Sequence, residues 1–486
     1  MPCTTILVGK KATVDGSTII SRNDDGRFET KHIIVMDPDK QPKRYKSVIS
    51  HLEIELPKKA LRYTMTPNVT TKERGVWPAN GINEANVGMT ATETITSNPL
   101  VYGADPLVVY QKAKGGKKAV PGGIGEEDLV ELVLPYIKSA REGVLRTGQL
   151  LEKYGTYEEN GMAFNDADEV WWLETIGGHH WIARRVPDDR VVIMPNQFGL
   201  DNFDFDDAYG EGKDNLCSKD LKEFVEKNHL YKGRDGVFNP RLAFGSKSDS
   251  DHIYNTPRAW FLTRYFLPHT YKFDGENADF TPTSDNLPWS FVPEEKVTIE
   301  DIRTLLGSYY QDTPYNPYDA KAPYHGKYRT IAVPNTDVLA ILQIRGYLPK
   351  EIQGVQWYSL GGSGFTACFA LYSNVKKLPE YVSAKPKTVT TDHMYWHSRL
   401  IAALTDAHYN TAVLLDERYR NKVFNESQRI IDEYDAKVKS AKSVALLEEA
   451  NKKITDMVKE ASDSALGEIL ANASEYMKIR YHRGDN

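Results

Sequence analysis

The sequence has few cysteines and no long apolar run, and each absence excludes a class of protein. Its three cysteines, Cys3, Cys217 and Cys368, lie far apart, which excludes a disulfide framework and a cysteine metal motif and fits a reducing compartment. The chain does not open with a basic segment followed by an apolar one, and no apolar stretch is long enough to span a bilayer. These features predict a soluble cytoplasmic protein without a membrane partner.

Strong charge of one sign is also missing. The formal net charge is −6, the pI is near 6.1, and no lysine- or arginine-rich block occurs, which excludes nucleic acid as the main partner. The pair His179-His180 has no third ligand at metal-binding spacing, so we predict neither a metal nor another cofactor. The 28 tyrosines and 8 tryptophans suit a large core and the lining of a substrate pocket.

The pattern of apolar residues predicts a mixed α and β chain. Helical spacing occurs in residues 126–138, 256–266 and 298–306, and short apolar runs predict strands at 169–175, 180–184, 191–194, 330–333, 339–344, 355–360 and 367–371. From residue 393 to about 479 the pattern is helical with few breakers, which predicts two or three amphipathic helices for packing or oligomer contacts. We therefore expect a domain over residues 3–390, a helical extension over 391–486, and a homo-oligomer.

The first 25 residues predict a β-hairpin that contains a candidate nucleophile. Residues 4–8 and 17–20 are apolar or β-branched, with Gly9 and Asp15-Gly16 marking the turn between them. Pairing Gly9 with Gly16 places Cys3 opposite Arg22, whereas a tighter turn at Asp15-Gly16 places Cys3 opposite Phe28. We favour the first register because it brings a thiol next to a guanidinium.

The position of Cys3 suggests a specific chemistry. Removal of Met1 and Pro2 would leave Cys3 with a free α-amine, whose pKa of roughly 7.7–8.0 lets it act as a base near neutral pH. A base next to a nucleophile is what thiol activation requires, and a nearby Arg22 would favour the thiolate further. The alternative is that Cys3 is a small buried residue at the start of a strand.

The residues from Cys3 to Ala12, Cys-Thr-Thr-Ile-Leu-Val-Gly-Lys-Lys-Ala, followed by Asp15-Gly16-Ser17, resemble the start of the bacterial dipeptidase family of N-terminal-nucleophile hydrolases. The likeness extends to about Val375, with further agreement at residues 81–84, 172–175, 181–186, 329 and 356–357. The wider superfamily includes conjugated-bile-salt hydrolases and penicillin V acylases. The resemblance implies an α+β fold, a four-layer αββα sandwich of two antiparallel sheets.

The resemblance also implies roles for single residues. Cys3 matches the nucleophile, and Arg22-Asn23-Asp24-Asp25 resembles the family's Arg-Asn-x-Asp, so Arg22 and Asp25 become catalytic candidates. Asp25 would hold Arg22 or orient the Cys3 amine, or else be an exposed turn carboxylate. Asn196 resembles a site asparagine of the acylases.

Four further residues complete the candidate site. Arg258 would hold site carboxylates by a bidentate pair, or form a structural ion pair. Asn83, Thr92 and Glu93 are candidate substrate-binding residues, and Thr92 or Glu93 stands where the acylases have an oxyanion-hole asparagine. This departure leaves the second oxyanion donor unassigned.

The leading hypothesis is a cysteine dipeptidase that forms an acyl-thioester on Cys3 after Met1 and Pro2 are removed, with dipeptides as its partners. One alternative is an amidase of non-peptide acyl amides with the same nucleophile, which a comparison of dipeptide and acyl-amide substrates separates. The other is a non-catalytic interaction protein that retains the fold, whose signature is an unprocessed N-terminus.

Overall fold

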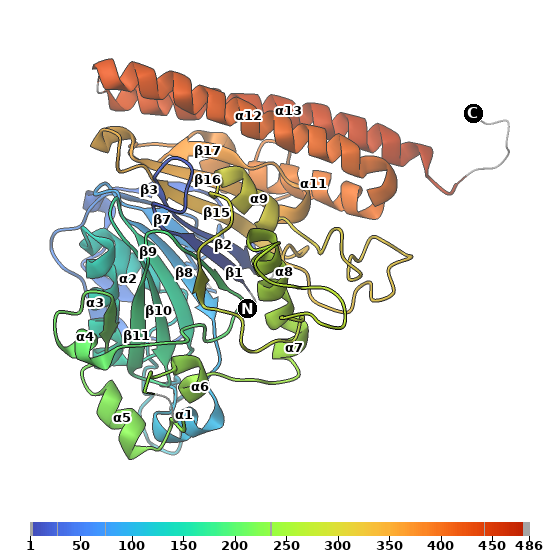
Figure 1. Cartoon of the computed structure of the whole chain (residues 1–486). Coiled ribbons are helices and arrows are strands. Elements are labelled where there is room, and N and C mark those ends of the chain that lie inside the picture. The colour runs from blue at the N-terminus through green and yellow to red at the C-terminus, as the bar shows by residue number, and fades with distance from the viewer. Residues whose placement is uncertain (1–2, 27, 73, 234–235, 442, 480–486) are drawn as a thin grey trace.

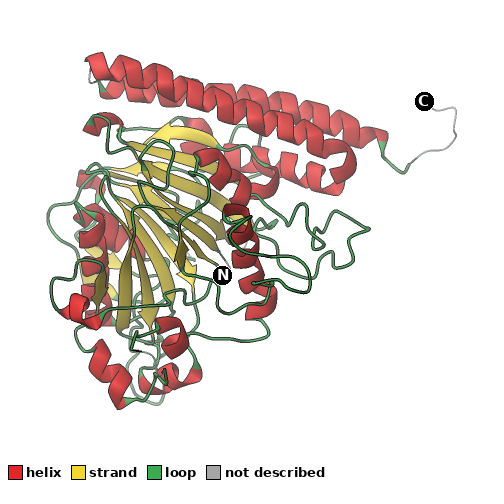
Figure 2. Cartoon of the chain, in the orientation of Figure 1, coloured by secondary structure: helices red, strands yellow, loops and turns green. Residues whose placement is uncertain are grey.

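Two large antiparallel sheets form the centre of the molecule in the computed structural model, which describes residues 3–479 except 27, 73, 234–235 and 442 (Figures 1 and 2). The seven-stranded sheet has the order β14 (Ser290–Phe291), β12 (Val191–Met194), β1 (Thr4–Val8), β2 (Thr18–Asp25), β15 (Thr336–Ile344), β16 (Gly354–Leu360) and β17 (Phe369–Tyr372). The six-stranded sheet has the order β13 (Asn215–Cys217), β11 (His180–Val186), β10 (Val170–Ile176), β9 (Asn160–Asn165), β8 (Gly88–Thr94) and β7 (Asn80–Ile82).

The two sheets pack face to face through one side of each strand. Successive side chains of a strand point to opposite faces, so alternate residues of β1 and β2 face the second sheet. Leu7 and Ile20 share a buried cluster with Trp172 and Ile182 of the second sheet. Cys3 has the same parity as Leu7, which directs the candidate nucleophile toward the layer between the sheets.

Helices cover the outer face of each sheet and complete four layers. Against the six-stranded sheet lie α2 (Leu129–Val133) and α3 (Ala140–Tyr154), and against the seven-stranded sheet lie α8 (Thr256–Phe266), α9 (Ile299–Leu306), α11 (Met394–Ala407), α12 (Tyr409–Ala441) and α13 (Val444–Glu475) (Figure 1). The predicted α+β class with an αββα arrangement is therefore confirmed.

Short elements connect these layers. Two small two-stranded sheets pair β3 (Ile34–Met36) with β6 (Tyr63–Met65) and β4 (Arg44–Lys46) with β5 (Glu53–Glu55). The remaining helices are α1 (Pro99–Ala104), α4 (Phe205–Tyr209), α5 (Leu221–Lys227), α6 (Pro240–Phe244), α7 (Asp251–Tyr254) and α10 (Glu380–Ser383). No helix in the described part of the chain combines the length and the apolar character that crossing a membrane requires.

Two predicted elements differ from the structure, and proline is the reason in both. The helix predicted over residues 126–138 is limited to α2 and a 3₁₀ turn at Leu134–Tyr136, because Pro135 lacks the N–H that would continue the helix. The strand predicted over residues 330–333 is a bend that runs into Pro334. By contrast, α9 begins at the predicted position, where Thr298 and Asp301 form a capping box.

The long C-terminal helices pack along each other and on the sheet through polar as well as apolar contacts. Arg345, which follows β15, forms a two-pronged ion pair with Asp435 of α12 at 2.6 and 3.0 Å, and Tyr372 of β17 donates to the same carboxylate at 2.7 Å. Asn451 of α13 forms hydrogen bonds with both backbone groups of Tyr372. The division at residue 390 stays a prediction.

Removal of the Asp435 carboxylate is expected to destabilise the protein strongly. Arg345 and Asp435 are both buried, so Asp435→Ala leaves a buried guanidinium without its partner, at a cost of about 3–5 kcal/mol. Chemical denaturation measures the change in free energy of unfolding. Asp432→Ala removes an exposed carboxylate from the same helix and should leave stability nearly unchanged; an equal effect of the two substitutions would contradict the prediction.

Candidate active site

The β1–β2 hairpin forms as predicted, but both predicted registers are wrong. Thr5, not Cys3, lies opposite Arg22, and Val8 lies opposite Ile19. The predictions failed because they considered the hairpin alone. In the structure the N–H of Gly9 donates to the backbone carbonyl of Arg190, so Gly9 does not pair with β2. The shift amounts to two residues, and a two-residue shift leaves every side chain on its original face.

Arg22 therefore still lies against the thiol. Its Nη2 atom is 3.1 Å from the Sγ atom of Cys3, 2.8 Å from Oδ1 of Asp24 and 2.7 Å from Oε1 of Glu126, and Nη1 donates to the carbonyl of Ala79. Cys3 is 1% exposed and Arg22 is 2% exposed. One buried guanidinium thus connects the sulfur with two carboxylates.

Sequence reasoning did not identify the two carboxylates or the lysine behind them. Asp24 lies two residues after Arg22 on the same face of β2, and strand alternation alone could have pointed to it. Its carboxylate also pairs with Lys31 at 3.1 Å, and Lys31 donates to the carbonyl of Trp77 at 2.7 Å. Glu126 comes from a loop more than 100 residues away, and no local signal marks it.

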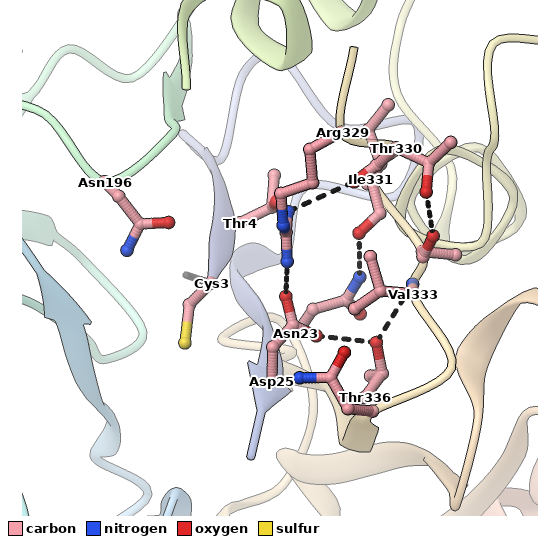
Figure 3. A network of polar contacts seen from close by, with 12 residues as sticks. Cys3, Thr4, Asn23, Asp25, Asn196, Arg329, Thr330, Ile331, Val333 and Thr336 are labelled. Carbon is pink, nitrogen blue, oxygen red and sulfur yellow. Dashed lines mark hydrogen bonds and ion pairs between the residues drawn. The ribbon is translucent and has the colours of Figure 1, made fainter. Parts of the chain in front are cut away.

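Asp25 is fully buried and does not hold Arg22, which contradicts two of its three predicted roles, the Arg22 partner and the exposed turn carboxylate. It lies on the opposite face of β2, where Arg329 and the Thr336 hydroxyl, at 2.6 Å, bind its carboxylate (Figure 3). The prediction failed because adjacent strand residues point to opposite faces, so Asp24 and not Asp25 shares the face of Arg22. The predicted role of Asp25 at the Cys3 amine stays a prediction.

Arg258 is fully buried and joins the start of β1 to the end of β12. It donates to the carbonyl of Cys3, to the Thr4 hydroxyl at 2.6 Å, to the carbonyl of Pro195 at 3.0 Å and to Oδ1 of Asn196 at 2.8 Å. No carboxylate of the described residues lies within ion-pair distance, so neither predicted role of Arg258 as a carboxylate partner is correct. Burial, together with the charge of Arg329, lowers its pKa to about 9.

Asn196 is held in one orientation beside the start of β1. Its φ of 66° is in the left-handed region, which asparagine tolerates better than most residues. Because Arg258 donates to Oδ1, the Nδ2 end of the amide is fixed on the other side, where it donates to the carbonyl of Thr94 at 2.9 Å. The backbone N–H of Asn196 donates to the carboxylate of Glu93.

The three predicted substrate-binding residues lie in different surroundings. Glu93 and Thr92 project from the end of β8 toward the site: Glu93 supports Asn196, and the N–H of Thr92 is 3.4 Å from Oε1 of Glu126. The side chain of Asn83, in contrast, forms its hydrogen bonds with the backbone of its own turn and of residues 134 and 137. These contacts stabilise a turn and do not connect Asn83 to Cys3.

The electrostatics of the site keep the thiol protonated. Burial raises the pKa of Cys3 to about 11 although the charge of Arg22 opposes the shift, so the expected preference for thiolate is not met. Burial also raises the pKa of Glu93 to about 8. Because the Cys3 thiol is protonated, it needs a base that removes its proton before the sulfur can act as a nucleophile.

Replacement of Arg22 by lysine is expected to lower kcat by roughly 10- to 100-fold, the equivalent of one or two charge-assisted hydrogen bonds. An ammonium keeps the charge but lacks the planar fork with which Arg22 reaches sulfur, carboxylates and carbonyl together. Steady-state kinetics with a dipeptide measures the effect, and Arg44→Lys, at an exposed arginine, is the control. Full kcat in a folded Arg22→Lys protein would refute this role.

No set of three or more His, Cys, Asp and Glu side chains is arranged to hold a metal among residues 3–479 as far as they are described. The histidines of the His179-His180 pair both contact Asp105, at 2.9 and 2.7 Å. These two contacts stabilise the turn between β10 and β11.

The chain matches one family model and several curated proteins over most of its length. Residues 2–422 match the family model described as peptidase family C69. The chain is 45% identical to a dipeptidase of Bifidobacterium longum, with both chains covered in full, and 42% identical to dipeptidase A of Lactobacillus helveticus, with 99% and 98% covered. A conjugated bile acid hydrolase from Clostridium perfringens aligns over 76% of this chain and 92% of its own, at 11% identity and a TM-score of 0.32.

Proposed function

The chain belongs to peptidase family C69, and from this premise we propose that it is a dipeptidase whose nucleophile is the thiol of Cys3. The observation that carries the proposal is the buried contact between Sγ and Arg22, in a chain that resembles dipeptidases over its whole length. The expected removal of Met1 and Pro2 concerns residues outside the described part of the structure.

The proposed base is the α-amine of Cys3. With a thiol pKa of about 11, only about one molecule in 10⁴ carries a thiolate at pH 7. An amine with a pKa near 8 takes the proton directly or through a water, and sulfur attacks the carbonyl carbon of the peptide bond. The amine then returns the proton to the leaving amine, and water hydrolyses the acyl-thioester.

The proposed oxyanion donors are the amide of Asn196 and a backbone N–H. Arg258 supports this arrangement because it binds the Cys3 carbonyl and Oδ1 of Asn196 at the same time, which holds both beside the reacting sulfur. One such donor contributes roughly 2.7–4 kcal/mol to the transition state. In this scheme Arg258, Glu93 and Asp24 are positioning residues, and Arg22 contacts the reacting atom.

A substrate comparison tests the proposal. The purified enzyme is assayed with a panel of dipeptides and with non-peptide acyl amides, among them a conjugated bile salt and penicillin V. Hydrolysis of dipeptides that depends on Cys3 is the expected result. Cleavage of the acyl amides alone would replace the dipeptidase by the amidase alternative, and no cleavage in a chain that begins at Cys3 would favour an interaction protein.

A further inference from the structure

A buried ion pair lies on the face of β2 that points away from the thiol. The guanidinium of Arg329 binds Oδ2 of Asp25, and the Thr336 hydroxyl donates to Oδ1 at 2.6 Å (Figure 3). Asp25 is fully buried, and the side chain of Arg329 is 8% exposed. Asp25 has a predicted role at the Cys3 amine, but the proposed mechanism does not use Arg329, which comes from more than 300 residues further along the chain.

The register of the hairpin places Asp25 on the amino side of Cys3. Thr4 pairs with Asn23, so one more step along the ladder brings Cys3 opposite Asp24. Because the strands are antiparallel, the next residue of β2, Asp25, lies beyond Cys3 in the direction of its α-nitrogen. The carboxylate is also close enough for its charge to act on Cys3: burial is the main cause that raises the pKa of the thiol, and the charge of Asp25 adds to the shift.

The Asp25 carboxylate has both a cation and room for a further hydrogen bond. An ionised carboxylate offers about four acceptor positions, and Arg329 and the Thr336 hydroxyl take two of them. Burial raises the pKa of Asp25, and the charge of Arg329 opposes this shift most strongly. Arg258, the other guanidinium nearby, binds the Cys3 carbonyl instead. Arg329 is therefore the cation that keeps this buried acid in its charged form.

The segment that carries Arg329 is fixed against the end of β2. The hydroxyl of Tyr310 donates to the carbonyl of Arg329 at 2.7 Å. Gly26, directly after β2, donates its N–H to the carbonyl of Asn335 at 2.9 Å and accepts the Asn335 side chain at 2.8 Å. These contacts hold the guanidinium in place before any substrate arrives.

We propose that Arg329 is a positioning residue of the reaction: it neutralises Asp25 from one side, so that this carboxylate orients the Cys3 α-amine without holding it as an ammonium. The inference rests on the proposed function and adds a residue to the same site. Asp25 accepts one N–H of the amine, which leaves the nitrogen lone pair for the thiol proton. A neutral amine can take that proton, whereas an ammonium cannot.

The charges around the start of β1 determine the direction of the pH effect. The thiol side carries the ionisable groups Arg22, Asp24, Glu93 and Glu126, and the opposite side carries Asp25, Arg258, Tyr310 and Arg329. Replacing Arg329 by a neutral residue removes one positive charge from this set and leaves Asp25 without its cation. Both changes favour the ammonium, so the pKa of the amine rises and activity begins at a higher pH.

The pH dependence of kcat/KM for a dipeptide tests the inference. For Arg329→Gln we expect the pH at which activity rises to move up by about one unit, so that kcat/KM at pH 7 falls about tenfold. Arg329→Lys keeps the charge and should keep the profile near that of the wild type. Arg303→Gln, which removes another buried arginine with an ion pair of its own, is the control, and its profile should not move.

An unmoved profile in a folded Arg329→Gln protein would overturn the inference. If that variant does not fold, Asp25→Asn combined with Arg329→Gln removes both charges and leaves no buried charge unpaired. We expect the profile of this double variant at the wild-type position with a lower kcat, and a profile that moves up by a full unit would contradict the inference. Full activity of Cys3→Ala, or of a chain extended in front of Cys3, would instead overturn the proposed function, so the two failures are distinguishable.

Discussion

Replacement of Cys3 by alanine is expected to abolish dipeptide hydrolysis, with a loss in kcat on the order of 10⁴-fold or more. The substitution removes the only atom that can form the acyl-thioester, and no second thiol is close enough to replace it: Cys217 lies in β13 of the other sheet and Cys368 packs in the core on the outer side of the first sheet. Cys3→Ser should retain a trace of activity, since a hydroxyl is a far poorer nucleophile near neutral pH.

The fold should survive the alanine substitution. Cys3 precedes β1, and its side chain interacts with Arg22 rather than with the apolar cluster between the sheets. Thermal unfolding and a dipeptide assay on the same preparation separate loss of chemistry from loss of structure. Cys217→Ala is the matched control and should keep full activity; substantial turnover by a folded Cys3→Ala protein would remove Cys3 from its proposed role.

A chain that still carries residues in front of Cys3 is expected to be inactive. In a peptide bond the nitrogen of Cys3 is part of a planar amide and cannot accept a proton, whereas a free α-amine has a pKa of roughly 7.7–8.0. The thiol, with a pKa raised to about 11 by burial, cannot ionise at neutral pH without such a base. The loss of kcat in the extended chain, compared with the chain that begins at Cys3, should therefore approach the loss caused by Cys3→Ala.

One fusion protein provides both forms. A site-specific protease that cuts directly before Cys3 converts an extended chain into one that begins with the cysteine. Intact-mass measurement gives the fraction of each form, and activity is expected to rise in proportion to the chains that begin at Cys3. Equal specific activity before and after the cut, with the extension still present by mass, would exclude the α-amine as the base.

Local patterns predicted much of this fold because the interactions that decide them lie close together in the chain. The hairpin of β1 and β2, the capped start of α9 and the helices after residue 393 follow from alternation, capping and helical spacing. Predictions failed where a distant contact competed with the local pattern. The turn after Val8 is an example, since the backbone of Arg190 determines where the first strand ends.

In the candidate site, too, the predictions from local sequence held and those that depended on distant contacts failed. Cys3 and Arg22 could be paired from sequence because they lie on neighbouring strands of one hairpin, and a register error of two residues keeps them on one face. The resemblance made Asp25 a candidate to hold Arg22, but strand alternation turns its side chain toward Arg329. Arg258 was expected to bind carboxylates, and only the folded chain shows that it binds the backbone of Cys3 and the amide of Asn196.

The sequence by itself determined the two-residue repeat of the strands, the position of a cysteine near the chain start and the charge that Arg22 brings beside it. Only the tertiary structure decided that the thiol is buried and protonated, and that Glu126 binds Arg22 from a distant loop. The physical reason is that burial and charge pairing depend on which distant segments meet. A strand pattern specifies the face of a side chain but not what packs against it.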